Sequence, residues 1–130
     1  MIKKTITIFI IIFGILNVYS DEFKDSVDKY ILEEDYDSLT KILSDSFGKE
    51  NYSEAEALFF DKAKSMIFAK EYKKARKILE VILFVNFENN EAQELFISVG
   101  NIISQQEAAE KKKKEAEEKK RLEEEEALLK

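Results

Sequence analysis

The sequence contains no cysteine, histidine, tryptophan or proline, and only three of its 130 residues are glycine. Without histidine and cysteine, the chain has no imidazole bases, thiolate nucleophiles, disulfides or usual zinc and copper ligands. Catalysis would have to rest on carboxylates, lysine or tyrosine, and we expect no metal and no cofactor. Strand-and-turn architectures lack their turn residues, whereas helix-forming Lys, Glu, Leu, Ile and Ala are abundant. We therefore expect a small all-α fold with at most one domain.

The first twenty residues have the pattern of a secretory signal peptide. Lys3 and Lys4 precede the apolar residues 6–16, and Val18 and Ser20 fit the two specificity positions of a cleavage site. The alternative is an uncleaved membrane anchor, but the apolar run has 15 residues and spanning a bilayer takes about 20. We expect cleavage and a periplasmic or secreted protein, with membrane association only if the segment is retained.

The chain that remains after cleavage is acidic. Its net charge is −8, because residues 1–20 carry two lysines and no acid and the whole chain has a net charge of −6. A nucleic-acid backbone is negative and would be repelled. Nucleic acid is therefore not an expected partner.

Residues recur at a separation of 36 positions in the middle of the chain. Seven identities fall in a single register: Phe23 with Phe59, Asp25 with Asp61, Ile31 with Ile67, Tyr36 with Tyr72, Lys41 with Lys77, Ile42 with Ile78, and Leu43 with Leu79. A repeat of this length filled with helical patterns is typical of stacked helix pairs, which cannot bury their apolar faces alone.

The second repeat divides into two expected helices. Ser53 and Glu56 form a capping-box pattern that predicts a helix over about residues 54–70. A short turn at residues 70–72 follows. The next apolar stripe ends before residues 88–90 and consists of Ala75, Ile78, Leu79, Ile82, Leu83 and Phe87.

The first repeat shows the same pattern more weakly, and a further helix follows the second. Around a turn at residues 34–36, the first repeat has the apolar positions Phe23, Val27, Tyr30, Ile31, Leu39, Ile42, Leu43 and Phe47, with Gly48 as an expected helix C-cap. The further helix has Ala92, Leu95, Phe96, Val99, Ile102 and Ile103. No partner helix follows it, and Gly100 inside it costs about 1 kcal/mol relative to alanine.

At these residues the sequence resembles the tetratricopeptide repeat (TPR) family, in which each repeat is a helix A, a turn and a helix B. The matching positions in the second repeat, about residues 56–89, are Phe59, Ala63, Met66, Tyr72, Ala75, Leu79 and Ile82. In the first, about residues 20–53, Leu39 and Ser46 replace small residues of the family pattern. The resemblance implies about two helix-turn-helix repeats plus a capping helix over residues 21–104.

The resemblance also implies a concave surface that binds another protein or a peptide. The family's usual positions on helix A correspond here to Lys24, Asp28, Leu32, Phe60, Lys64, Phe68 and Phe96. For Leu32 and Phe68, ordinary packing between helices is an equal alternative. Phe60 and Phe96 lie 36 residues apart and are expected on this surface, unless they belong to the core.

Residues 105–130 form a charged tail with nine Glu and eight Lys or Arg. Glu107 with Lys111, and Glu115 with Lys119, are among several i, i+4 pairs in the favourable order. We expect an isolated, solvated helix or partial disorder. A coiled coil is the alternative, since Leu122 and Leu129 are seven apart, but the heptad does not extend backwards. The last three residues close no element, which is compatible with a piece of a longer protein.

Three kinds of function are compatible with these sequence features. A binding module or scaffold in the cell envelope, not an enzyme, is the expectation that follows from the TPR resemblance. A structural role, with the tail as a spacer on a membrane-anchored chain, is the alternative. A hydrolase that uses a carboxylate pair, Asp25 with Asp28 or Glu33 with Glu34, is the third, but a charge on a helix face usually serves only solvation.

Overall fold

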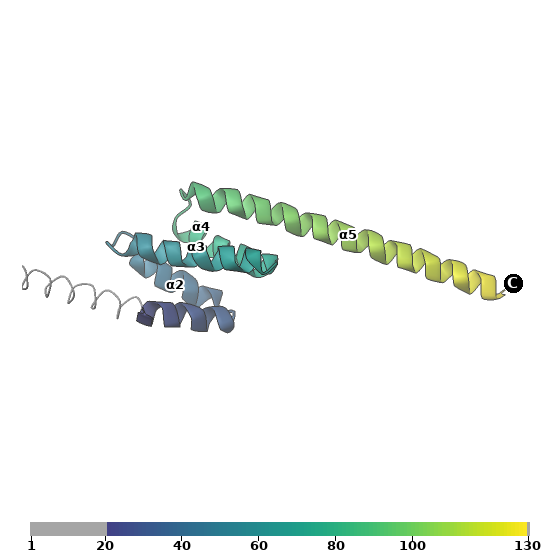
Figure 1. Cartoon of the computed structure of the whole chain (residues 1–130), viewed down its shortest axis with the longest axis horizontal. Coiled ribbons are helices and arrows are strands. Elements are labelled where there is room, and N and C mark those ends of the chain that lie inside the picture. Colours follow the sequence, from purple (N-terminus) through teal and green to yellow (C-terminus); the bar gives the residue numbers. More distant parts are fainter. Residues whose placement is uncertain (1–20, 130) are drawn as a thin grey trace, which may run out of the picture. The chain divides into compact units, whose positions relative to one another are not determined.

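The computed structural model describes residues 21–129, and the signal segment expected at residues 1–20 lies outside them. The described residues form five helices and no strand (Figure 1). The first covers residues 21–32 in the described part. The others are α2 (Tyr36–Ser46), α3 (Tyr52–Phe68), α4 (Tyr72–Val85) and α5 (Asn90–Leu129). The all-α class and the long charged C-terminal helix are therefore confirmed.

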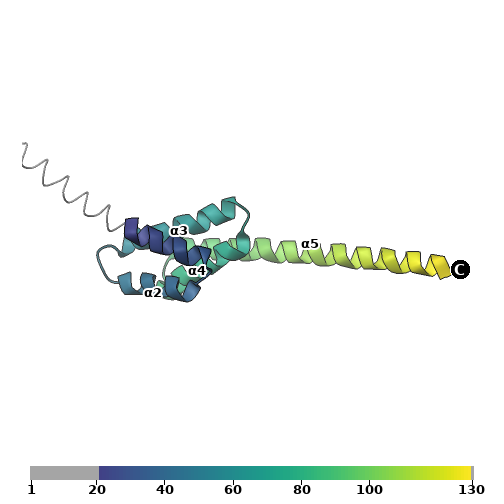
Figure 2. The same cartoon turned by 90° about the horizontal axis from the view of Figure 1, so that it is seen from below.

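The chain divides into two compact units at Phe59 and Phe60. The first unit contains the helix over residues 21–32, α2 and the beginning of α3. The second contains the remainder of α3, α4 and α5, and α4 packs against α5. Figure 2 shows the five helices from a second direction. No helix among residues 21–129 is both long and apolar enough to cross a membrane.

The turn between the first helix and α2 is closed by two backbone hydrogen bonds. The Asp35 N–H donates to the Tyr30 carbonyl at 2.8 Å, and the Glu34 N–H donates to the Ile31 carbonyl at 3.1 Å. This pair of bonds defines a Schellman motif, which needs a residue with left-handed backbone at its centre. Glu34 takes that role with a φ of 55°.

The turn between α3 and α4 has the same closure 36 residues later. The Glu71 N–H donates to the Met66 carbonyl at 2.8 Å, and the Lys70 N–H donates to the Ile67 carbonyl at 2.9 Å. Lys70 has a φ of 63°. The sequence repeat is thus also a repeat of backbone geometry, and both turns lie where the sequence predicted them.

Most of the buried apolar residues come from the expected apolar stripes. In the first unit the buried apolar residues are Val27, Leu39, Leu43, Ala55 and Phe59. In the second they are Ala63, Ala75, Ile78, Leu79, Val81, Ile82, Ala92, Val99 and Ile103. Ser46, which replaces a small residue of the TPR pattern, is also buried and donates its hydroxyl to the Ile42 carbonyl at 3.1 Å. A polar group can be accommodated there because its hydrogen bond is made.

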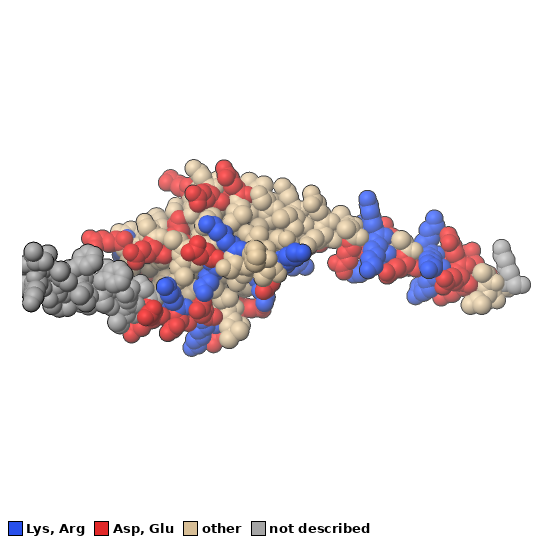
Figure 3. Space-filling view, viewed as in Figure 1, with Lys and Arg blue, Asp and Glu red and all other residues tan. Residues whose placement is uncertain are grey.

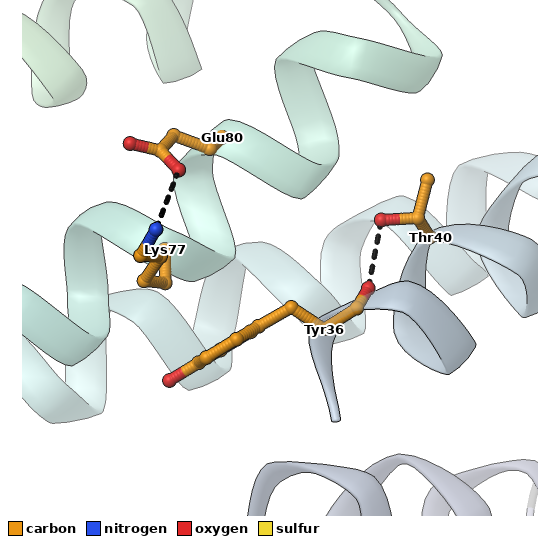
Figure 4. Close-up of polar contacts among 4 residues, drawn as sticks. All are labelled: Tyr36, Thr40, Lys77 and Glu80. Carbon is orange, nitrogen blue, oxygen red and sulfur yellow. Dashed lines mark hydrogen bonds and ion pairs between the residues drawn. The ribbon is translucent and has the colours of Figure 1, made fainter. Parts of the chain in front are cut away.

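Hydrogen bonds and ion pairs inside single helices supplement this burial. Within α2, the Thr40 hydroxyl donates to the Tyr36 carbonyl at 2.8 Å. Within α4, the Lys77 ammonium lies 3.6 Å from the Glu80 carboxylate, and both side chains are about half exposed. Figure 4 shows both contacts. Exposed pairs of this kind contribute roughly 0.2 to 1 kcal/mol each, much less than the buried apolar residues.

Three local expectations are wrong. The helix expected over about residues 54–70 begins at Tyr52, so Ser53 lies inside α3 and is not its N-cap. Phe47 and Phe87 were expected on apolar stripes, but they are 56% and 74% exposed. Phe47 directly follows the last residue of α2, and Phe87 lies two residues after the last residue of α4, so the helical spacing that predicted their burial no longer applies.

Gly48 lies in a turn directly after α2 and does not form the expected helix C-cap. Phe47 has φ −61° and ψ 131°, Gly48 has φ 80°, and the Lys49 N–H donates to the Ser46 carbonyl at 3.0 Å. These values describe a type II turn, whose third residue requires a positive φ. Gly100, in contrast, lies inside the continuous helix α5, and a Cβ there would meet nothing within 4 Å.

The same substitution at these two glycines should have opposite effects on stability. We predict that Gly100→Ala raises the free energy of unfolding by about 0.5 to 1 kcal/mol, because alanine is the better helix former. We predict that Gly48→Ala lowers it by about 1 kcal/mol or more, because alanine is strained at positive φ. Urea unfolding of the two variants and the parent measures both changes in the free energy of unfolding. Changes of the same sign would contradict the placement of Gly100 inside a helix and of Gly48 in a turn that needs positive φ.

Asp35 caps α2, and its titration should affect stability. Its carboxylate accepts from the Ser38 hydroxyl at 2.6 Å and from the Ser38 N–H at 3.1 Å. The hydrogen bonds from the Ser38 hydroxyl and the Ser38 N–H hold the pKa of Asp35 below its ordinary value of 3.8. A lowered folded-state pKa gives stability that is present above the unfolded-state pKa and is lost as pH falls through the folded-state value.

We therefore predict that Asp35→Asn, which keeps an accepting oxygen, loses less stability than the parent as pH falls below about 3.8. Asp35→Ala removes the cap and should melt at a lower temperature than the parent at neutral pH. Thermal melts of the three proteins across this pH range provide the test. If the melting temperatures of the parent and of Asp35→Asn fall equally with pH, titration of the Asp35 carboxyl does not cause the loss of stability.

Candidate functional site

The residues expected to bind a partner lie in two stripes, one in each unit. Lys24, Asp28 and Leu32 follow one another at intervals of four on the first helix, and all three are exposed. Residues four apart lie on the same side of a helix. The first stripe is therefore a continuous exposed strip on one face of that helix.

The second stripe lies on the part of α3 that belongs to the second unit. It consists of Phe60, Lys64 and Phe68, again at intervals of four. Lys64 is exposed and Phe60 is half-buried, and the Lys64 ammonium lies 4.4 Å from the centroid of the Phe60 ring. This is a cation–π contact, worth about 0.5 to 1 kcal/mol at an exposed site, and it holds the ammonium near the ring face.

Leu32 and Phe68 are the most informative members of the two stripes. They are 86% and 92% exposed. Ordinary helix packing, which the sequence left open for both residues, does not occur at either position. Each is the last helical residue before a Schellman turn, two positions ahead of the left-handed Glu34 or Lys70. The repeat thus presents a large apolar side chain to solvent at the same local position in both units.

Phe60 and Phe96 are neither fully exposed nor part of the core. Both are half-buried, whereas their neighbour Phe59 is 1% exposed and its ring lies 6.3 Å from that of Phe23. Each side chain is therefore partly accessible to solvent. Of the seven expected residues, Phe60 and Lys64 are in direct contact.

The second unit has further exposed apolar residues that the sequence does not predict to bind a partner. Phe84 and Ile97 are 79% and 63% exposed, and both lie outside the buried stripes of their helices. Their signal in the sequence was their position off the apolar stripe. That signal is weak, because single exposed apolar side chains are common on protein surfaces.

The four carboxylates weighed as catalytic pairs are at the surface. Asp25, Asp28, Glu33 and Glu34 are all exposed. A carboxylate that acts as a general acid near neutral pH needs burial or a close partner to raise its pKa. Across residues 21–129, no group of three or more acidic side chains could hold a metal ion.

Comparison with protein-family models, with curated proteins and with solved structures finds no match to this chain.

Two phenylalanines of α3 provide a direct test of the division between core and surface. We predict that Phe59→Ala, at a fully buried position, lowers the free energy of unfolding by about 3 to 5 kcal/mol. Phe68→Ala should change it by no more than about 0.5 kcal/mol. The two changes are chemically identical and lie in one helix, so urea unfolding compares burial alone. Similar losses in both variants would show that Phe68 packs against the protein.

Proposed function

We propose that this protein is an exported, TPR-like protein-binding module that acts as a scaffold or assembly factor in the cell envelope. One observation carries the proposal: Leu32 and Phe68 are highly exposed at equivalent positions of the two hairpins. A single exposed apolar residue would need no explanation. Recurrence of one at the same position in a repeat is what a binding surface built from repeated units requires.

The chemistry of the stripes indicates what kind of partner would bind. Aromatic side chains that become desolvated supply much of the energy of protein interfaces. In the second stripe, Phe68 offers such an anchor, and Lys64 offers a cation beside the Phe60 ring. A peptide or helix with apolar residues around a carboxylate would satisfy both groups, because the carboxylate can pair with Lys64 while the apolar residues cover the rings.

Export is supported by the composition of residues 1–20, where a positive start precedes a short apolar run. Retention of this segment would instead place the repeats at a membrane, with α5 as a spacer. That alternative is favoured by the complete exposure of α5 beyond Ile103. In either case the helical repeats are the part that would bind a partner.

The double variant Leu32→Ser, Phe68→Ser tests the proposed surface. We predict that the parent retains a partner from the envelope fraction of its native host and that the double variant retains at least tenfold less. A tenfold loss corresponds to about 1.4 kcal/mol, which is modest for removal of two anchors. Because both positions are exposed, the melting temperature should change by no more than a few degrees.

The matched control is Leu129→Ser, at a position that is 89% exposed in the tail. It makes the same kind of change outside the two stripes and should leave retention of the partner unchanged. Equal retention by the parent and the double variant would exclude this surface. An equal loss of retained partner in the control would mean that non-specific hydrophobic binding, and not the two stripes, causes retention.

A further inference from the structure

The tail of α5 is exposed along its whole described length, and its charges alternate in blocks. Every residue from 104 to 129 is exposed. Basic residues at 111–114 and 119–121 alternate with acidic residues at 115–118, interrupted by Ala116, and at 123–126. Figure 3 shows the successive red and blue bands along the helix. These charged blocks are therefore not buried against the helical repeats.

The spacing of the blocks also stabilises the helix from within. The Lys114 ammonium lies 3.3 Å from the Glu110 carboxylate, and the Arg121 guanidinium lies 4.0 Å from that of Glu125. Both are i, i+4 pairs, worth about 0.2 to 0.5 kcal/mol each. The tail can therefore remain helical without a partner, which leaves a preformed charged surface.

This surface is its own electrostatic complement when the segment is reversed. About the midpoint between Glu118 and Lys119, the basic block 111–114 falls opposite the acidic block 123–126. Glu117 and Glu118 fall opposite Lys120 and Lys119 in the same way. Nearer the ends, Ala108 and Ala109 fall opposite Leu129 and Leu128. No position in this register opposes two charges of the same sign.

Six of these residues lie along one side of the helix and form what we call the tail stripe: Ala109, Lys113, Glu117, Lys120, Glu124 and Leu128. Their intervals are four, four, three, four and four residues, which keeps them on one face. The order of intervals is the same in both directions. A second stripe running antiparallel can therefore oppose the first along its full length.

We propose that the tail stripe binds the tail stripe of a second copy of this chain in antiparallel orientation. Lys113 then faces Glu124 of the second copy, and Glu117 faces Lys120. Twofold symmetry makes each ion pair occur twice, and Ala109 meets Leu128 at both ends. The overlapping segment lies wholly within the exposed residues 104–129, so no buried residue has to be displaced.

Two features favour the antiparallel arrangement over parallel ones: opposite charges face each other, and the interface is complete with two chains. In a parallel pair in register, Lys113 would face Lys113 and Glu117 would face Glu117, which is repulsive. A parallel pair shifted by one place of the stripe has opposite charges in contact, but it forms fewer ion pairs and leaves an open end that can add further copies. Twofold symmetry closes the interface after two chains.

The interface holds mainly by charge, because the stripe has no continuous apolar seam. Exposed ion pairs are weak individually and are screened by salt. The dimer should therefore form at an ionic strength of about 0.01 M, where the Debye length is about 30 Å, and dissociate at about 1 M, where it is about 3 Å. A heptad coiled coil would depend much less on salt, because apolar residues hold its seam.

Two full-chain variants with opposite stripes test the proposal by sedimentation. Lys113→Glu with Lys120→Glu makes an entirely acidic stripe, and Glu117→Lys with Glu124→Lys makes an entirely basic one. Each should sediment as a monomer at low salt, because its own copies repel. An equal mixture should sediment at twice the monomer mass, since every facing pair is again of opposite sign. Helical circular dichroism of the mixture should have the same amplitude per residue as that of the parent, which shows that the tails are still folded.

Failure of the mixture to dimerise while the tails remain helical would overturn the proposal, as would dimers of either variant alone. A parent protein that stays monomeric at low salt, at concentrations where the mixture dimerises, would also overturn it. A parent dimer that persists at about 1 M salt would show that apolar contacts, and not the charge pattern, hold the copies together.

The absence of cysteine makes the orientation directly measurable. Antiparallel pairing brings Ala109→Cys of one copy opposite Leu128→Cys of another. It separates two Ala109→Cys residues by about 28 Å along the helix axis, at about 1.5 Å per residue. Mild oxidation at low salt should therefore crosslink the mixed variants much faster than either one alone. Rapid crosslinking of Ala109→Cys to itself would indicate a parallel pair and exclude the proposed geometry.

Discussion

Reversal of the chain at Glu34 and Lys70 is the constraint on which both helix hairpins depend. Helices of 11 and 14 residues, such as α2 and α4, are marginal in water without tertiary packing. A partner helix can cover an apolar stripe only if the chain turns back within a few residues. Left-handed backbone at a residue other than glycine costs roughly 1 to 2 kcal/mol. Both sites accept that strain, and burial of residues such as Leu39 and Leu79 offsets it.

Much of this architecture could be predicted from the sequence because periodicity reports burial well. The 36-residue recurrence placed both turns, and the stripe containing Ala75, Ile78, Leu79 and Ile82 is buried as expected. The ends of the helices are harder to predict from the sequence, because helix propensity and capping patterns are weak local signals. Ser53 with Glu56 matches a capping box, yet α3 begins one residue before Ser53. Once α4 ends at Val85, helical spacing no longer determines where Phe87 points.

The candidate binding residues show where a single sequence stops being informative. Spacing placed Leu32 and Phe68 on one side of their helices, but it could not say whether a neighbouring helix covers that side. The structure settles this point, because both side chains are exposed. Half-burial of Phe60 and Phe96 could not be foreseen either, because it depends on packing between segments. Membership of the TPR family and the identity of a partner stay predictions, since no related protein tests them.

The two parts of α5, before and after Ile103, follow different physical rules within one helix. Up to Ile103, burial of Ala92, Val99 and Ile103 holds the helix to the second unit. Beyond Ile103, helix propensity and ion pairs between neighbouring turns maintain it in water. Salt should consequently weaken the tail while it leaves the buried part largely intact. A change in ionic strength would then alter the proposed pairing of the tails without unfolding the helical pairs that would hold a partner.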